Sequence, residues 1–119
     1  MSNKEKVLKI KREKYTSKEN VERYSYYVDC VIRGKEVKAT LIPGDIGGYD
    51  VLDIVFGDSS TADLIVVPFS MVDEKTGKEI NGNGYEARNI DENGEVYSCK
   101  IKPRQGSDKS IIEMLLARL

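Results

Sequence analysis

The amino-acid sequence predicts a β-rich α+β domain: a bent antiparallel sheet or partly open barrel of about seven strands, with one C-terminal helix packed on it. Two stretches, residues 24–41 and 85–101, alternate apolar and polar side chains with the period of a strand on both sides of a glycine-containing turn. The pattern changes to a helical period only near the C-terminus. No linker or internal repeat divides the sequence, so residues 1–119 are expected to form a single domain, with strands within 6–103 and a helix at about 108–118.

The first expected strand is at residues 7–14, with its even positions facing inward, and a hairpin follows at residues 24–41. Gly34-Lys35 is the predicted two-residue turn, because such turns favour glycine at the first position. This turn pairs apolar residues with apolar residues across the two strands, whereas a slip by one residue would place the whole set on the wrong face. The expected pairs are Ile32–Val37, Cys30–Ala39 and Val28–Leu41.

A second hairpin is predicted around Gly94, which lies in the acidic turn at residues 91–95. Only a three-residue loop, with Gly94 in the left-handed conformation as a bulge, places the apolar residues of both strands on one face. The expected pairs are Asn89–Tyr97, Ala87–Cys99, Tyr85–Ile101 and, on the opposite face, Glu86–Lys100.

Residues 49–56 and 64–72 are expected to form two further strands, because branched and aromatic side chains dominate both. Pro68 has no backbone N–H, which predicts that the second of them is an edge strand or carries a bulge. A tight turn is expected at residues 76–77. Residues 79–84, with the sequence Glu-Ile-Asn-Gly-Asn-Gly, are expected to be a flexible connection, either a plain loop or a mobile functional loop.

The C-terminal segment 107–119 has the apolar spacing of a helix. Ser107 or Asp108 is expected to cap its start. A helix of about 11 residues is marginally stable alone, so its apolar stripe must be buried. We favour the interpretation that it covers an open side of the sheet, and the alternative is a partner-binding helix. The stripe consists of Ile112, Leu115, Leu116 and Leu119.

The stretch Pro-Gly-Asp-Ile-Gly-Gly at residues 43–48 shares only its glycines with a phosphate-binding loop. Such loops present backbone N–H groups at the start of a helix, whereas a strand is expected after Gly48. No Lys or Ser/Thr follows in the required pattern, so a turn is predicted. The nearby carboxylates are interpreted as solvated, with a calcium or magnesium site as the weaker alternative; they are Asp45, Asp50, Asp53, Asp58 and Asp63.

Composition and charge limit the expected compartment. The N-terminal residues precede no apolar segment, and the longest apolar run is far shorter than a membrane span, so a cytosolic protein is expected. Cys30 and Cys99 lie in apolar alternations and are predicted to be reduced core residues.

The net charge of −1 divides unevenly, with +5 over residues 1–40, −9 over 41–95 and +3 over 96–119. Either the basic ends attract the acidic middle, or a basic face binds a polyanion.

With no histidine, the sequence lacks the commonest general base and metal ligand, and it contains no catalytic motif. An enzyme is therefore not expected, and neither is a cofactor or a bound metal. The leading prediction is a non-catalytic cytosolic interaction module that binds a protein partner or a second copy of itself. Its expected surfaces are the edge strand at Pro68 and the C-terminal helix, through Ile112, Leu116 and Leu119.

Two alternatives stay open. A nucleic-acid-binding protein would use Tyr27, on the polar face of its strand, as a stacking platform beside a basic strip, provided that the two basic strands were neighbours. The basic residues are Lys9, Lys11, Arg12, Lys100, Lys102 and Arg104. The other alternative is a small hydrolase that uses a pair of carboxylates, although the 20 acidic residues single out no pair.

Overall fold

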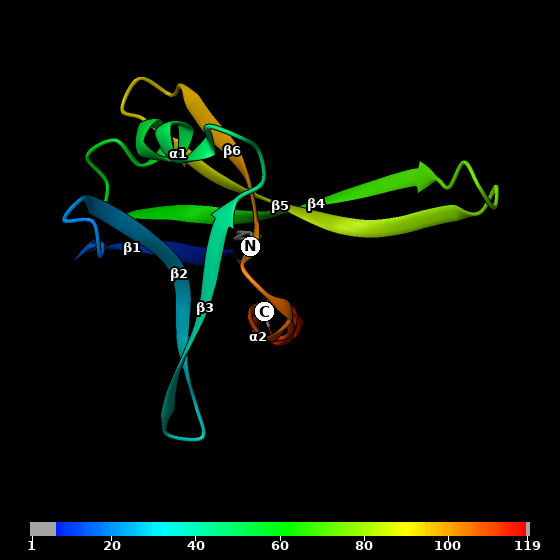
Figure 1. Ribbon diagram of the computed structural model, residues 1–119, viewed down its shortest axis with the longest axis horizontal. Helices are drawn as coiled ribbons and strands as arrows, with labels where there is room; N and C mark the ends of the chain where they lie inside the picture. The colour runs from blue at the N-terminus through cyan, green and yellow to red at the C-terminus, as the bar shows by residue number, and fades with distance from the viewer. Residues whose placement is uncertain (1–6, 119) are drawn as a thin grey trace, which may run out of the picture.

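The computed structural model describes residues 7–118 and has a β-rich α+β fold (Figure 1). Over these residues, six antiparallel strands close into a barrel in the order β1-β2-β3-β6-β5-β4, and two helices accompany them. The closed barrel replaces the expected partly open one of about seven strands. The elements are β1 (Leu8–Thr16), β2 (Glu22–Ile32), β3 (Lys35–Pro43), α1 (Gly48–Phe56), β4 (Thr61–Val72), β5 (Glu79–Ile90), β6 (Val96–Pro103) and α2 (Gly106–Ala117).

The two halves of the chain have the same order of elements, three meandering strands and then a helix. Two short ladders join the halves and close the barrel. In one, β1 pairs with β4 from Leu8–Leu64 to Lys11–Thr61, and in the other β3 pairs with β6 from Leu41–Pro103 to Pro43–Ile101. Closure pairs strands that would otherwise expose backbone groups along an open edge.

The core fills the barrel interior and extends under both helices. Within the barrel, alternate residues of the strands point inward, including Ile10, Val28 and Leu64, all nearly inaccessible to solvent. Figure 1 shows α1 above the sheet and α2 below it. The helices contribute Leu52, Val55, Phe56, Ile112 and Leu115 to the same cluster. The barrel is therefore filled and closed by side chains.

Residues 49–56 are helical, so the prediction of a strand there was wrong. One buried face of the helix carries Leu52, Val55 and Phe56, which have helical spacing. The many β-branched residues of this segment favoured a strand and concealed that spacing. Gly47 precedes the helix with a positive φ of 77°, and Gly57 follows it with a φ of 54°. The helix occupies residues that would have formed a seventh strand.

The hairpin at residues 24–41 forms, with a register two residues away from the expected one. The turn residues are Arg33 and Gly34, at φ values of 52° and 79°, because a two-residue turn of this kind needs two consecutive positive φ angles. A shift of two keeps every side chain on its expected face. The observed pairs are Ile32–Lys35, Cys30–Val37, Val28–Ala39 and Tyr26–Leu41.

The hairpin around Gly94 has all four expected pairs, and Gly94 has the expected left-handed conformation, with φ 82°. Cys99 of this hairpin is buried and Cys30 is half-buried against the core, both as free thiols. Burial raises the pKa of the Cys99 thiol, and Asp45 raises it further.

Residues 79–84 belong to strand β5, so the prediction of a flexible loop was wrong. They pair with β4 as far as Val72–Glu79, around a turn at residues 73–78 in which Gly77 has a φ of 67°. Figure 1 shows this ribbon extending away from the barrel, and we call residues 66–85 the arm. Beyond Leu64, β4 pairs only with β5 among the described residues, so Pro68 lies on an edge strand as expected.

Helix α2 begins at Gly106 and has Gln105 at its N-cap position, without a side-chain capping bond. The predicted cap by Ser107 or Asp108 was therefore wrong. Ile112 and Leu115 are buried, Leu116 is half-buried, and Leu119 lies outside the described residues. Neither α1 nor α2 is long and apolar enough to cross a membrane.

Candidate functional site

The structure separates the basic residues that would form a nucleic-acid-binding strip. Two other strands lie between β1 and β6 in either direction around the barrel. The basic residues of β1 and β6 therefore form no common strip. Lys9 forms an ion pair with Asp63, and Lys11 forms one with Asp29 at 3.0 Å. The hydrogen bond from Lys11 to Asp29 raises the pKa of Lys11. Acidic neighbours therefore pair with both Lys9 and Lys11.

Arg12 points into the α1 end of the barrel and attaches the helix to β1. Its guanidinium lies 4.5 Å from the centroid of the Tyr24 ring and 4.9 Å from that of Phe56. It donates a hydrogen bond to the Gly57 carbonyl at 3.0 Å and lies 3.6 Å from Asp53. These contacts account for Arg12 without a ligand.

The remaining proposed nucleic-acid residues are dispersed. The ring of Tyr27 lies on the outer face of β2, where Lys38 Nζ covers it at 4.5 Å from the centroid. Arg104 Nε lies 3.8 Å from the buried carboxylate of Asp108. Lys100 and Lys102 alone remain together, on the outer face of β6 and exposed.

The glycine-rich stretch forms a turn, as predicted, but a helix follows it instead of a strand. Gly48 packs so closely on Pro43 that an added Cβ would lie 2.3 Å from the proline Cβ. The glycine is therefore required for packing. Within residues 7–118, no three Asp, Glu or Cys side chains gather closely enough to hold a metal ion.

A groove at the root of the arm brings together residues that sequence analysis considered separately. It is a hollow of about 390 Å³ on the outer face of the sheet. Cross-strand pairing places Gly84 beside Val67 and Gly82 beside Phe69. The Phe69 ring lies over Gly82, because an added Cβ there would be 2.7 Å from Phe69 Cζ. Gly84 thus leaves open backbone on the floor of the groove, and Val67 and Phe69 form one wall.

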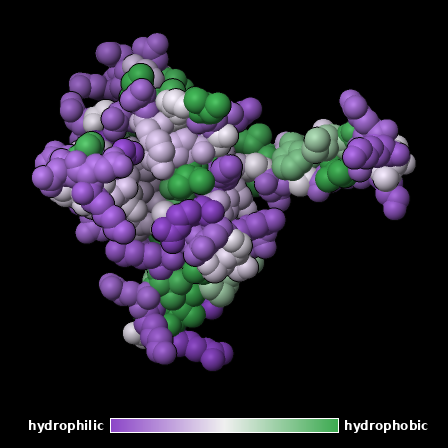
Figure 2. Space-filling model, in the orientation of Figure 1, coloured by the Kyte–Doolittle hydropathy of each residue, from purple (hydrophilic) through white to green (hydrophobic). Residues whose placement is uncertain are grey.

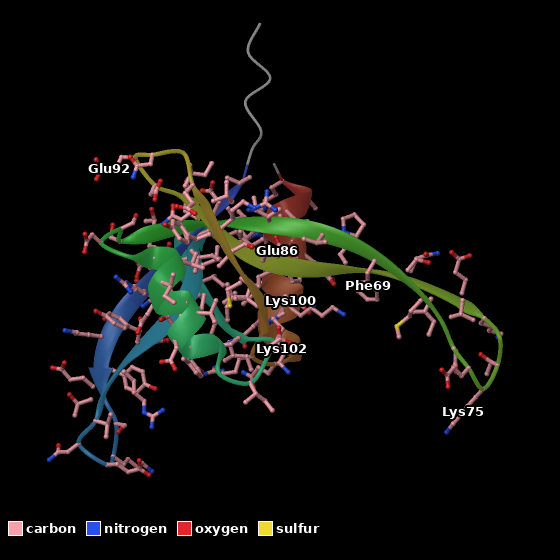
Figure 3. The ribbon with its side chains drawn as sticks, turned by 90° about the horizontal axis from the view of Figure 1, so that it is seen from above. Phe69, Lys75, Glu86, Glu92, Lys100 and Lys102 are labelled. Atoms are coloured by element: carbon pink, nitrogen blue, oxygen red, sulfur yellow. The ribbon has the colours of Figure 1, made fainter. Side chains whose placement is uncertain are left out.

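The other wall of this groove is basic. Lys100 pairs across the strands with Glu86, whose carboxylate is bound by Arg88 at 3.0 Å. Neither Lys100 nor Lys102 forms an ion pair with another described residue. Figure 3 shows the two lysines following one another along β6, with Phe69 on the neighbouring arm. The groove therefore presents an apolar wall opposite Lys100, which lines it, and Lys102 follows Lys100 along β6.

The apolar surface continues along the arm. Met71 and Ile80 are cross-strand partners on the same face as Phe69, and they are 54% and 44% exposed. Figure 2 shows this apolar surface between the barrel and a hydrophilic tip. Pro68, Lys100 and Lys102 were predicted from the sequence as candidate binding residues, whereas Phe69 was not. The sequence contains a signal for this groove, because Gly82 and Gly84 are two residues apart and so lie on the same face of a strand.

Comparison of the chain with protein-family models, with curated proteins and with solved structures gives no match. Evidence on function therefore comes from the geometry and charge of this chain's own side chains.

Proposed function

We propose that the protein is an interaction module whose arm-root groove binds a short segment of a protein partner, with an apolar side chain next to one or more carboxylates. The observation that carries this proposal is the groove itself. An apolar hollow with a backbone floor lies beside Lys100 and Lys102, neither of which has an acidic partner among the described residues.

The apolar part of the groove supplies affinity. Phe69 is 46% exposed and Val67 36% exposed, in a wall beside the open backbone at Gly84. Burying one large apolar side chain of a partner contributes about 1.5–3 kcal/mol. Such a contact would also stabilise the arm, since an isolated two-stranded ribbon is marginal in water.

The basic part of the groove supplies selectivity. An acidic residue beside the apolar anchor would meet Lys100 or Lys102, whereas a basic one would meet two like charges. Because Arg88 already binds Glu86, this glutamate competes weakly for the lysines. The partner segment is therefore acidic as well as apolar.

Pro68 supports docking in the groove rather than strand addition at the edge of the arm. An added strand needs an uninterrupted row of backbone N–H and C=O groups. Pro68 lies in the middle of the β4 edge and has no N–H to contribute. The edge is therefore a poor template for a ladder, and the face of the ribbon is the better surface.

Selection from a random peptide library on the intact protein tests the proposal. The expected enriched sequences place Asp or Glu within three residues of an aromatic or aliphatic residue. Binding of a selected peptide, measured by fluorescence anisotropy, should weaken about 30-fold in Phe69→Ala and at least about 10-fold in Lys100→Glu. Affinity should also fall as salt increases.

Two matched variants control for non-specific effects. Lys75→Glu makes the same charge change at the arm tip, and Ile90→Ala removes an exposed apolar side chain at the opposite end of β5. Both should bind as the unmodified protein does. A selection without acidic–apolar enrichment, or equal losses in Lys75→Glu and Lys100→Glu, would refute the groove as the binding site.

A further inference from the structure

A second hollow, distinct from the arm-root groove, lies at the α1 end of the barrel. It has a volume of about 400 Å³ and lies where β1 ends and β2 begins, beside α1. A neighbouring hollow of about 540 Å³ shares much of its lining. Four of the seven tyrosines of the chain face the two hollows: Tyr15, Tyr24, Tyr26 and Tyr49. We call these residues the tyrosine pocket.

Three rings of the tyrosine pocket are in a chain of aromatic contacts, Tyr24 to Tyr26 to Tyr49. The centroids of Tyr24 and Tyr26 are 6.4 Å apart, and those of Tyr26 and Tyr49 are 6.3 Å apart, with tilted planes. Tyr26 is buried in the middle, whereas Tyr15 is 47% and Tyr49 52% exposed. Fixed rings with exposed outer members provide a surface on which a planar group can stack.

The structure holds this surface in place before any ligand binds. Arg12 lies against Tyr24 on the core side, and the Tyr26 hydroxyl donates a hydrogen bond to Asp53 at 3.4 Å. The Tyr26 ring also packs against Phe56, with centroids 5.3 Å apart. Tyr24 and Tyr26 therefore have little side-chain freedom to lose on binding, which favours affinity.

The charges around the tyrosine pocket are paired, with one exception. Lys14 lies 3.6 Å from Glu22, and Arg12 lies 3.6 Å from Asp53. Arg23, which lines the same hollow and is exposed, has no ion pair with any residue from 7 to 118. The pocket therefore offers one free guanidinium at the edge of an aromatic surface.

This arrangement disfavours a cationic ligand. Aromatic cages bind quaternary ammonium groups through open ring faces. Here Arg12 already lies over Tyr24, and Lys14 Nζ lies 5.8 Å from the same ring centroid. A cation in the pocket would approach Lys14 and Arg23, which line it, whereas the lining carboxylates Glu22 and Asp53 already have cationic partners. A planar ligand with a negative group avoids that repulsion and gains a partner.

We propose that the tyrosine pocket binds a nucleotide, with the base stacked on the tyrosine rings and the phosphate paired with Arg23. Stacking on aromatic side chains beside cations is the usual mode of binding for unpaired bases. The nucleotide could be free or part of a single strand, because both present the same base and phosphate. This site is separate from Tyr27 and from the basic β6 strand, and it does not depend on the arm-root groove.

Titration of the full-length protein at low salt tests this inference. Because the chain has no tryptophan, tyrosine fluorescence reports stacking directly. The probes are adenosine monophosphate, adenosine, inorganic phosphate and single-stranded oligoadenylate. Adenosine monophosphate should bind saturably and at least about tenfold more tightly than adenosine or phosphate alone, because only the nucleotide uses both the rings and Arg23. Tighter binding of oligoadenylate per site would identify a single strand as the source, and equal binding a free nucleotide.

Variants separate the site from a general effect. Arg23→Gln should reduce nucleotide affinity to about that of adenosine, and Tyr49→Ala should weaken both about tenfold. Tyr49→Phe keeps the ring and should bind normally, which distinguishes loss of stacking from loss of folding. Tyr27→Ala and Arg118→Gln are the matched controls, since both residues lie outside the tyrosine pocket. Absence of saturable binding, or equal losses in Tyr27→Ala and Tyr49→Ala, would overturn the proposal.

Discussion

The carboxylate of Asp108 in α2 accepts a hydrogen bond from the backbone N–H of Thr40 in β3, with Oδ1 and N 2.9 Å apart. Asp108 is only 4% exposed, and its side chain is the one buried charged group of the described chain. Arg104 Nε lies 3.8 Å from the second carboxylate oxygen. An aspartate that the sequence assigns to helix capping thus joins the C-terminal helix to the barrel.

Replacing Asp108 should destabilise the fold, mainly through loss of the hydrogen bond to the Thr40 N–H. Asp108→Ala leaves the Thr40 N–H without its partner, so the free energy of unfolding should fall by about 1–3 kcal/mol. Asp108→Asn keeps an oxygen acceptor and should cost less. Urea unfolding followed by circular dichroism measures both. Ser107→Ala is the control: this exposed neighbour makes no capping bond, and a loss as large as that of Asp108→Ala would contradict the assignment.

Gly48 should tolerate no side chain, because an added Cβ would lie 2.3 Å from the Pro43 Cβ. Gly48→Ala forces the strand and α1 apart and should cost at least about 1–3 kcal/mol of stability. Gly106→Ala is the matched change at the first residue of α2, where an added Cβ meets nothing within 4 Å. That variant should be neutral or stabilising by up to about 1 kcal/mol. Thermal unfolding compares the two, and equal melting temperatures would show that the Pro43 contact does not matter.

Gly82 should control the position of Phe69. A Cβ at Gly82 would lie 2.7 Å from Phe69 Cζ, so Gly82→Ala must displace the ring from the groove. Affinity for a selected acidic–apolar peptide should fall about tenfold, with little change in the unfolding free energy, since the ring moves on the surface. Gly106→Ala serves as the control, because Gly106 lies outside the groove and an added Cβ there meets nothing within 4 Å. Similar affinities for the two variants would argue against a role for Phe69.

Ionisation of the buried Tyr26 phenol should lower the free energy of unfolding at alkaline pH. Burial, and then the nearby Asp53 charge, raise the pKa of Tyr26 from 10.0 to about 12. The folded state therefore favours the neutral phenol, and this stabilisation is complete below pH 10 and lost as the pH rises through 12. The loss should be on the order of 2 kcal/mol.

Tyr26→Phe removes that titration, so its unfolding free energy should decrease less than that of the unmodified protein between pH 10 and 12. A smaller dependence remains in both proteins. Burial, and then Glu113, raise the pKa of Tyr85, and a hydrogen bond to Asp91 raises that of Tyr97. Parallel pH curves for the two proteins, measured by urea unfolding, would show that Tyr26 is not the group responsible.

Local sequence was sufficient where neighbours in the chain determine the structure. The hairpin around Gly94 has the predicted pairs, because the glycine conformation and the alternation on its two strands act within 17 residues, 85–101. The β2–β3 hairpin forms with the predicted faces, and its two-residue shift reflects the demand of the turn for two positive φ angles. The helical period at the C-terminus likewise predicted α2 to within about two residues.

The tertiary structure decided what depends on distant residues. Residues 49–56 suit both a strand and a helix by composition, and the barrel end selects the helix, because its face with Leu52 and Phe56 covers the core. Barrel closure joins β1 to β4, whose paired residues are 50 to 56 positions apart, and local alternation contains no information on that pairing. Both proposed sites also depend on tertiary packing, because each combines different elements: Phe69 of β4 and Lys100 of β6 line the groove, and Tyr24 of β2 and Tyr49 of α1 line the tyrosine pocket.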